Sequence, residues 1–181
     1  TPIGYTSDAN CAYTGTFDGN SKTISGLYYS ENTSVKTNAG LFGYNKGTIS
    51  NITIKDSRFY LSSSVNFSSV AAIVGRNEGT VKYCYNTGTI NGTATATHYV
   101  GGICGYNKNQ ITNCDNSGIV NCTYAGEVSS AIGGICGVSN GKITDCNNAG
   151  KVSVESNGEA RVVGVCGDNY KGGTTENCHN T

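Results

Sequence analysis

Charge, histidine and long apolar runs are all scarce in this sequence, and each shortage excludes a class of partner. The 181 residues include 12 Lys plus Arg and 12 Asp plus Glu, so the formal net charge is zero. No charge excess therefore attracts nucleic acid or an anionic membrane surface. No apolar run is long enough to span a bilayer. We expect no nucleic-acid partner and no membrane insertion of this segment.

Residues that could carry catalysis or hold a metal are few and scattered. His98 and His179 are the only 2 histidines, so a Ser or Cys nucleophile has no evident base. A zinc site would need closely paired cysteines such as Cys-x-x-Cys, and no such pair occurs. Asp115 and Asp145 stand singly at positions that Asx turns explain. The sequence predicts no catalytic residue, no metal site and no cofactor.

A helical stripe of apolar residues is also absent, whereas a pattern of about 30 residues recurs along the whole chain. The clearest copies begin at Gly101 and Gly133 and read GGICGYNKNQITNCDNSGIV and GGICGVSNGKITDCNNAGKV. Short runs rich in Val, Ile, Thr and Tyr alternate with Asn, Gly, Ser and Asp, which is typical of strands and turns. In the first of these copies we expect strands at Ile103–Gly105, Gln110–Cys114 and Ile119–Thr123.

A repeat of this size cannot bury its apolar side alone, but stacked copies pair each strand with its equivalent in the next copy. The sequence therefore predicts an all-β fold, a right-handed parallel β-helix (solenoid) of about six coils with three short strands per coil. Residues 1–181 are expected to form a single domain of this kind. Because the chain starts at Thr1 without Met and stops just after a repeat asparagine, we expect a segment of a longer, processed surface protein.

Aligning the copies places the same residue types in columns, which stacking would turn into ladders. The asparagines of one column, expected to hydrogen-bond through their amides, are Asn45, Asn77, Asn107 and Asn169. The cysteines of two other columns are Cys104, Cys136 and Cys166, and Cys114 and Cys146. Earlier copies carry hydrophobic residues in these two columns, so the cysteines are expected to be buried free thiols.

Three questions about these columns stay open. Stacked neighbours such as Cys104 and Cys136 would lie near enough for a disulfide if its restrictive geometry were met. Cys11 and Cys122 lie outside both columns and are the better candidates for a bridge or an exposed thiol. Ile103 precedes Cys104 in a second apolar column, although neighbours on a strand point to opposite faces. Either the strand bends at the following glycine, or one column is covered from outside.

Tyrosine is abundant, with 12 residues. Tyr83 and Tyr85 flank an inward-pointing cysteine and are expected to be exposed, and Tyr44 and Tyr106 follow the repeat glycine. Exposed rings can stack on sugars or on a protein partner, so these four form the predicted ligand-binding set. The alternative is that Tyr is simply a good strand residue on an exposed face.

Four segments of variable length follow the third predicted strand of their copies. We interpret them as insertions along one edge of the rod, where solenoids often build their binding faces. The four segments are Tyr60–Val70, Asn91–Tyr99, Thr123–Ala131 and Glu155–Arg161.

Several stretches also resemble a known repeat. GLFGYNKGTISNITI, AIVGRNEGTVKYCYNTGTI and the two GGICG copies look like the GLUG motif of bacterial surface and secreted proteins, and Pro2–Tyr29 resembles the segment that commonly opens such arrays. Cys104, Cys136 and Cys166 depart from the aliphatic residue usual at that motif position. The resemblance implies an extracellular or cell-surface location in a bacterium, and it transfers no catalytic residues.

These observations together predict a non-catalytic, adhesin-like module for adhesion or ligand display. Its expected partner is a host or environmental glycan or a matrix protein, beside neighbouring domains of the same chain. The first alternative is a purely structural spacer or stalk. The second is a carbohydrate-active β-helix enzyme that works with clustered carboxylates.

Overall fold

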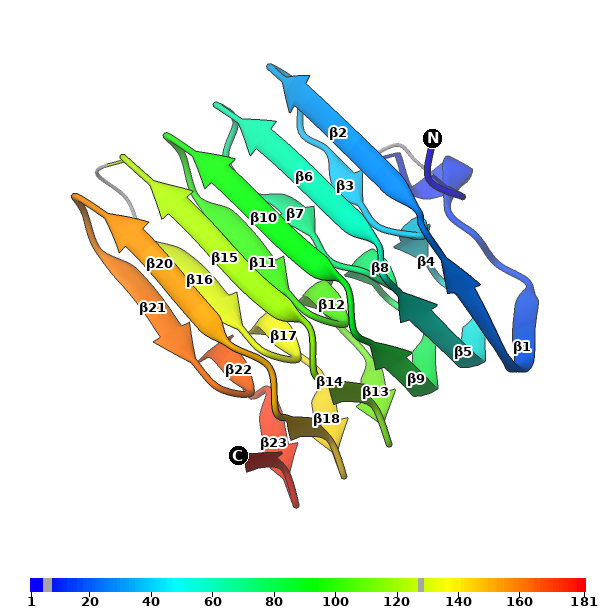
Figure 1. Ribbon diagram of the computed structural model, residues 1–181. Coiled ribbons are helices and arrows are strands. Elements are labelled where there is room, and N and C mark those ends of the chain that lie inside the picture. The colour runs from blue at the N-terminus through cyan, green and yellow to red at the C-terminus, as the bar shows by residue number, and fades with distance from the viewer. Residues whose placement is uncertain (5–7, 127–128) are drawn as a thin grey trace.

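A computed structural model describes residues 1–4, 8–126 and 129–181, and it confirms the predicted parallel β-solenoid (Figure 1). Strands of successive coils pair in parallel and in register, so that equivalent residues of the repeat lie directly over one another. Three of the sheets hold five strands each, which corresponds to about five turns of the solenoid. The one helical element of the described residues is a short 3₁₀ turn, η1 (Ala9–Cys11).

Each coil contributes to four sheets rather than to the three strands that the sequence predicted. Sheet I consists of β4 (Phe42–Asn45), β8 (Val74–Asn77), β12 (Cys104–Asn107), β17 (Cys136–Ser139) and β22 (Cys166–Asn169). Sheet II consists of β1 (Thr16–Ser25), β5 (Thr48–Lys55), β9 (Thr80–Asn86), β13 (Gln110–Thr112), β14 (Asp115–Asn116), β18 (Lys142–Thr144), β19 (Asn147–Asn148), β23 (Thr174–Glu176) and β24 (His179–Asn180).

Sheet III provides the long strands at the front of Figure 1, and sheet IV lies behind it. Sheet III consists of β2 (Tyr28–Thr33), β6 (Arg58–Ser63), β10 (Thr89–Ala94), β15 (Ile119–Tyr124) and β20 (Val152–Ser156). Sheet IV consists of β3 (Asn38–Ala39), β7 (Ser68–Val70), β11 (His98–Gly101), β16 (Ser130–Gly133) and β21 (Ala160–Val163). The chain visits the sheets in the order I, II, III, IV and then begins the next coil.

Sheet IV is the part of the coil that the sequence did not predict. Four of its five strands, all except β3, begin within the four segments that were interpreted as variable insertions. In the third coil, for example, Asn91–Tyr99 holds the end of β10, a turn and the start of β11. Residues 127–128 of the segment Thr123–Ala131 lie outside the described residues, as do residues 5–7 of the Pro2–Tyr29 stretch.

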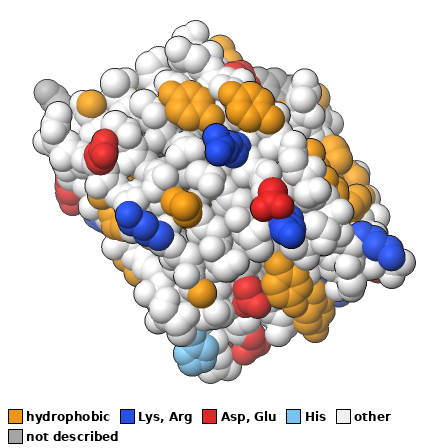
Figure 2. Space-filling view, in the orientation of Figure 1, with side chains coloured by type: hydrophobic (Ala, Val, Ile, Leu, Met, Phe, Trp, Pro, Cys, Tyr) orange, Lys and Arg blue, Asp and Glu red, His pale blue; other side chains and the backbone are white. Residues whose placement is uncertain are grey.

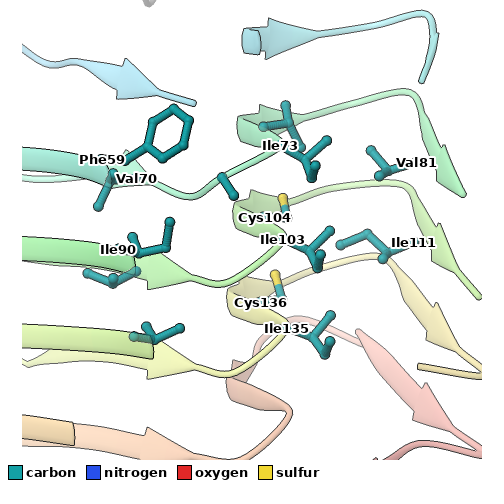
Figure 3. Close-up of a cluster of buried hydrophobic side chains, with 14 of the residues drawn as sticks. Phe59, Val70, Ile73, Val81, Ile90, Ile103, Cys104, Ile111, Ile135 and Cys136 are labelled. Carbon is teal, nitrogen blue, oxygen red and sulfur yellow. The ribbon is translucent and has the colours of Figure 1, made fainter. Parts of the chain in front are cut away.

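The core explains why two adjacent residues of the repeat are both apolar. Figure 3 shows Ile103 stacked over Ile135 and Cys104 over Cys136, with both columns inside the solenoid. Both neighbours point inward because the chain turns from sheet IV to sheet I at residues 102–103, ahead of the first residue of β12. The bend therefore precedes the cysteine instead of following it.

All nine cysteines are free, and the thiol columns are buried as predicted. Burial raises the pKa of the Cys136 thiol well above its ordinary value, which keeps it protonated and poorly nucleophilic. The sequence left a bridge or an exposed thiol open for Cys11, and the structure shows an exposed free thiol. Cys122 belongs to sheet III and its thiol is buried on the inner face of that sheet, which raises its pKa to about 12. The expectation of an exposed or bridged thiol is therefore wrong for Cys122.

The polar columns form hydrogen-bonded ladders inside the coil. The amide of Asn45 donates to Asn77 at 2.8 Å, and that of Asn77 donates to Asn107 at 2.9 Å. Asn169 was predicted to continue this ladder, but it is exposed and its amide donates to Thr175 at 3.0 Å. The turn after Asn169 is two residues longer than in the other copies, so the side chain closes this turn instead. A second ladder, with steps of 2.8 Å, joins Asn86, Asn116, Asn148 and Asn180.

Candidate ligand-binding groove

Sheets IV and I approach closely at the corner where the repeat places a glycine. A Cβ added at Gly105 would lie 2.7 Å from the Ser69 Cβ and 3.0 Å from the Val70 nitrogen. One added at Gly137, one coil further on, would lie 2.7 Å from the Val100 nitrogen. No side chain fits into these spaces. The glycine column therefore lets the backbone of sheet I press against sheet IV, and residues on the outer sides of both sheets can line one hollow.

That hollow is a groove of about 600 Å³ along the outside of sheets IV and I. It is lined by side chains from successive coils, and its aromatic rings are those of Phe67, Tyr99, Tyr106 and Tyr170. Figure 2 shows the face in front of sheet III, which carries scattered charges of both signs and two small groups of hydrophobic side chains on a mostly white surface. A concave surface lined by aromatic rings and a few charged side chains is typical of a ligand-binding site.

Three of the rings form a connected row. The ring centroids of Phe67 and Tyr99 lie 6.1 Å apart, and those of Tyr99 and Tyr106 lie 5.5 Å apart. Tyr99 comes from sheet IV and Tyr106 from sheet I, so the row crosses the corner between the sheets. Burial raises the pKa of Tyr99 to about 12, which keeps its hydroxyl protonated at neutral pH.

A cluster of charges borders the row of rings. The Arg76 guanidinium lies 4.8 Å from the Tyr44 ring centroid and 5.7 Å from that of Tyr106. It donates to Glu78 at 2.6 Å, and the Lys108 ammonium lies 2.9 Å from the same carboxylate oxygen. Burial opposes the charge of Glu78, but hydrogen bonds from Arg76, Lys108 and Tyr44 outweigh it and hold its pKa at about 2. Glu78 is therefore ionised at any physiological pH.

Two further cations, Lys36 and Arg161, line the groove. Lys36 lies over the Phe67 ring, with its ammonium 5.8 Å from the centroid. Burial lowers the pKa of Lys36, and the positive charges of Arg76 and Lys108 lower it further. Arg161 forms an ion pair with Asp168, so the positive charge at that point of the groove is neutralised.

The structure separates the four tyrosines that the sequence grouped as a ligand-binding set. Tyr106 lines the groove. Tyr44 is only 2% exposed, because the Arg76 guanidinium covers its ring. A ligand in the groove cannot reach this ring, so its predicted ligand-binding role is wrong. Tyr83 and Tyr85 are 44% and 40% exposed, as predicted, but they belong to sheet II and are absent from the lining of the groove.

Several groove residues were missed by sequence reasoning. Phe67 and Tyr99 lie in the segments interpreted as insertions, whose position along one edge of the rod was the one available signal. Arg76 stands in register between Tyr44 and Tyr106, so the column itself could have indicated an outward position. Lys108 follows Asn107 as Glu78 follows Asn77, so the register itself places these two opposite charges one coil apart. Lys36 carried no comparable signal, because it precedes β3 of sheet IV, a sheet that the sequence did not predict.

Tyr83 has an unusual backbone conformation for its residue type. Its φ is 53°, and the equivalent positions of the other coils have φ between 50° and 55°. Those positions hold residues that tolerate left-handed backbone angles, namely Asn51, Asn113, Asp145 and Asn177. A left-handed conformation costs most L-residues roughly 1–2 kcal/mol. The fold alone would favour Asn or Asp at this site.

We therefore expect Tyr83→Asn to raise the free energy of unfolding by about 1 kcal/mol, because Asn adopts this backbone conformation more easily. Urea denaturation followed by circular dichroism measures the change. Tyr85→Asn is the matched control, since Tyr85 has no positive φ and should gain nothing. Equal stability of the wild type and Tyr83→Asn would show that the tyrosine is not strained.

In the described part of the chain, no helix has the length and apolar character needed to cross a membrane. Nor do three or more His, Cys, Asp or Glu side chains gather there in an arrangement that could hold a metal ion. Comparison with known proteins found no matching family model, no matching curated protein and no matching solved structure.

Proposed function

We propose that this chain is a non-catalytic, adhesin-like module that binds glycans in the groove between sheets IV and I. The observation that carries the proposal is the row of Phe67, Tyr99 and Tyr106, whose rings line one hollow across neighbouring coils. Aromatic faces are the usual platforms on which sugar rings stack. With the resemblance to GLUG repeats, this favours a bacterial surface or secreted protein that meets host or environmental glycans or glycosylated matrix proteins.

The backbone at Phe67 supports the same role. Phe67 has a φ of 66°, which is unfavourable for a bulky side chain, and its ring is about half exposed. Neither feature stabilises the fold. Strained backbone and exposed aromatic surface at one residue are expected where the ring serves a binding surface.

The environment of the carboxylates favours binding over hydrolysis. A glycosidase needs one carboxylic acid with a raised pKa and a second carboxylate beside it. Glu78 has its pKa held at about 2 by its cationic neighbours, so it cannot serve as a general acid. Asp168 is paired with Arg161. Both carboxylates position cations in the groove, which suits recognition.

A glycan array probed with the purified chain and two double variants tests the proposal. Tyr99→Ala/Tyr106→Ala should weaken saturable binding by about tenfold or more, because each stacked ring contributes roughly 0.5–1.5 kcal/mol beyond its buried area. Tyr83→Ala/Tyr85→Ala removes two exposed rings outside the groove and should leave binding unchanged. Circular dichroism confirms that both variants are folded.

The other outcomes identify the competing functions. Loss of binding only in Tyr83→Ala/Tyr85→Ala would move the site to sheet II. No binding to any glycan or matrix protein would favour the structural spacer. Cleavage of a bound polysaccharide would favour the carbohydrate-active enzyme.

A further inference from the structure

Three cations gather in one part of the groove, and one carboxylate offsets them. Arg76 and Lys108 both contact the same oxygen of Glu78, at 2.6 and 2.9 Å. Among the described residues, no carboxylate lies within ion-pair distance of Lys36. This cluster therefore carries an excess of positive charge, although the chain as a whole has a formal net charge of zero.

The three positive charges lie close enough to repel one another. After burial, the charges of Arg76 and Lys108 are the causes that lower the pKa of Lys36. Like charges in a partly buried site destabilise each other, because water screens them poorly there. An anion bound among the three would relieve this repulsion. The cluster thus has the electrostatic character of an anion-binding site.

Unpaired polar atoms beside the cluster point to a ligand independently of charge. The Nε of Arg76 and the Oδ1 of Asn140 are buried, and neither has a hydrogen-bond partner among the described residues. Both residues line the groove. Native proteins rarely leave buried donors and acceptors unpaired. Once a bound ligand shifts the side chains that cover them, the first atom can donate to an anionic oxygen, and the second can accept from a sugar hydroxyl.

We propose that the groove selects acidic glycans and places a sugar carboxylate or sulfate at the cluster of Lys36, Arg76 and Lys108. The neighbouring rings of Phe67, Tyr99 and Tyr106 then hold the faces of the sugars on either side of the anionic group. Arg161 forms an ion pair with Asp168, which neutralises its charge, so we place the anionic group of the ligand at the cluster and not at Arg161. This specificity rests on the proposed function of the groove as a glycan-binding site.

Matched pairs of polysaccharides test the selection by charge. The full chain is titrated with polygalacturonate and its methyl ester, and with chondroitin sulfate and its desulfated form. Calorimetry at about 0.15 M salt suppresses long-range attraction. The two pairs separate a carboxylate ligand from a sulfate ligand. Lys36→Gln/Lys108→Gln is compared with Lys55→Gln/Lys151→Gln, which changes the net charge equally but at sites outside the groove lining.

Desulfated chondroitin keeps its uronate carboxylates, so the second pair isolates the sulfate. We expect at least one pair to show a difference of at least tenfold, with tighter binding by the member that carries the additional charge, namely the free carboxylates of polygalacturonate or the sulfates of chondroitin sulfate. Lys36→Gln/Lys108→Gln should abolish that difference, and Lys55→Gln/Lys151→Gln should retain it. Equal affinity within both pairs would overturn selection for acidic glycans while leaving the groove as a glycan site. Equal losses in both lysine variants would overturn the assignment to the cluster. No binding by any polysaccharide, here and on the array, would overturn the proposed function together with this specificity.

Discussion

Gly137→Ala is expected to lower the free energy of unfolding by about 3 kcal/mol, at the upper end of the usual cost of overpacking. The added Cβ would lie 2.7 Å from the Gly105 oxygen and 2.7 Å from the Val100 nitrogen. Both are backbone atoms within parallel ladders, so neither can move aside as a flexible side chain would. Relief would require sheets I and IV to separate. Urea denaturation of the variant measures the loss.

Gly15→Ala provides the control for this substitution. Its added Cβ would meet the end of the Tyr13 side chain, with the hydroxyl oxygen 3.0 Å away, and none of the three nearest atoms belongs to the backbone. The control should therefore cost less than about 1 kcal/mol. If Gly137→Ala were as stable as Gly15→Ala, the two sheets could not be packed as closely as the corner requires. The close packing of sheets I and IV that positions the rings of the groove would then be absent.

The solenoid was predictable because its cause is local and repeated. Each copy buries the same columns, so matching positions in the sequence become matching positions in space. The asparagine ladder from Asn45 to Asn107 and the buried thiols of Cys104 and Cys136 follow directly from that register. The one exception in the asparagine column, Asn169, occurs where a longer turn changes the repeat.

The groove was not predictable because it depends on contacts between sheets and between coils. Tyr44 appears outward within its own copy, yet Arg76 of the next coil covers it. Tyr99 and Tyr106 belong to different sheets, and only the glycine corner brings their rings to 5.5 Å. Strands of sheet IV are two to four residues long, which is too short for a pattern of alternation to identify.

His98 lies inside the coil without a partner for its ring. It is fully buried, and neither ring nitrogen has a hydrogen-bond partner among the described residues. The sheet III strand beside it carries Gly92, and a Cβ added there would lie 2.7 Å from the Val100 Cγ2 and 3.6 Å from the His98 Nδ1. The imidazole therefore lies at contact distance from Gly92, and Val100 excludes a larger residue there. Burial lowers its pKa from 6.5 to about 4, because the charged ring would lose its hydration.

This burial makes the stability of the solenoid depend on pH. In the unfolded chain His98 takes up a proton near pH 6.5, whereas the folded chain resists protonation until about pH 4. The unfolded state therefore binds more protons between these values, so the free energy of unfolding falls as the pH falls. The penalty is absent above pH 6.5 and reaches about 3 kcal/mol once the pH is below the folded value.

His98→Leu should remove this dependence, because leucine fills a similar volume and does not titrate. Urea denaturation from pH 7 to pH 4 should show the wild type losing about 3 kcal/mol more than the variant, since all other groups titrate equally in both. His179→Leu removes an exposed histidine and should leave the wild-type slope unchanged. Identical slopes for wild type and His98→Leu would contradict a buried neutral imidazole. The next residue, Tyr99, carries a ring of the groove, so acid should weaken glycan binding in the wild type before it does so in His98→Leu.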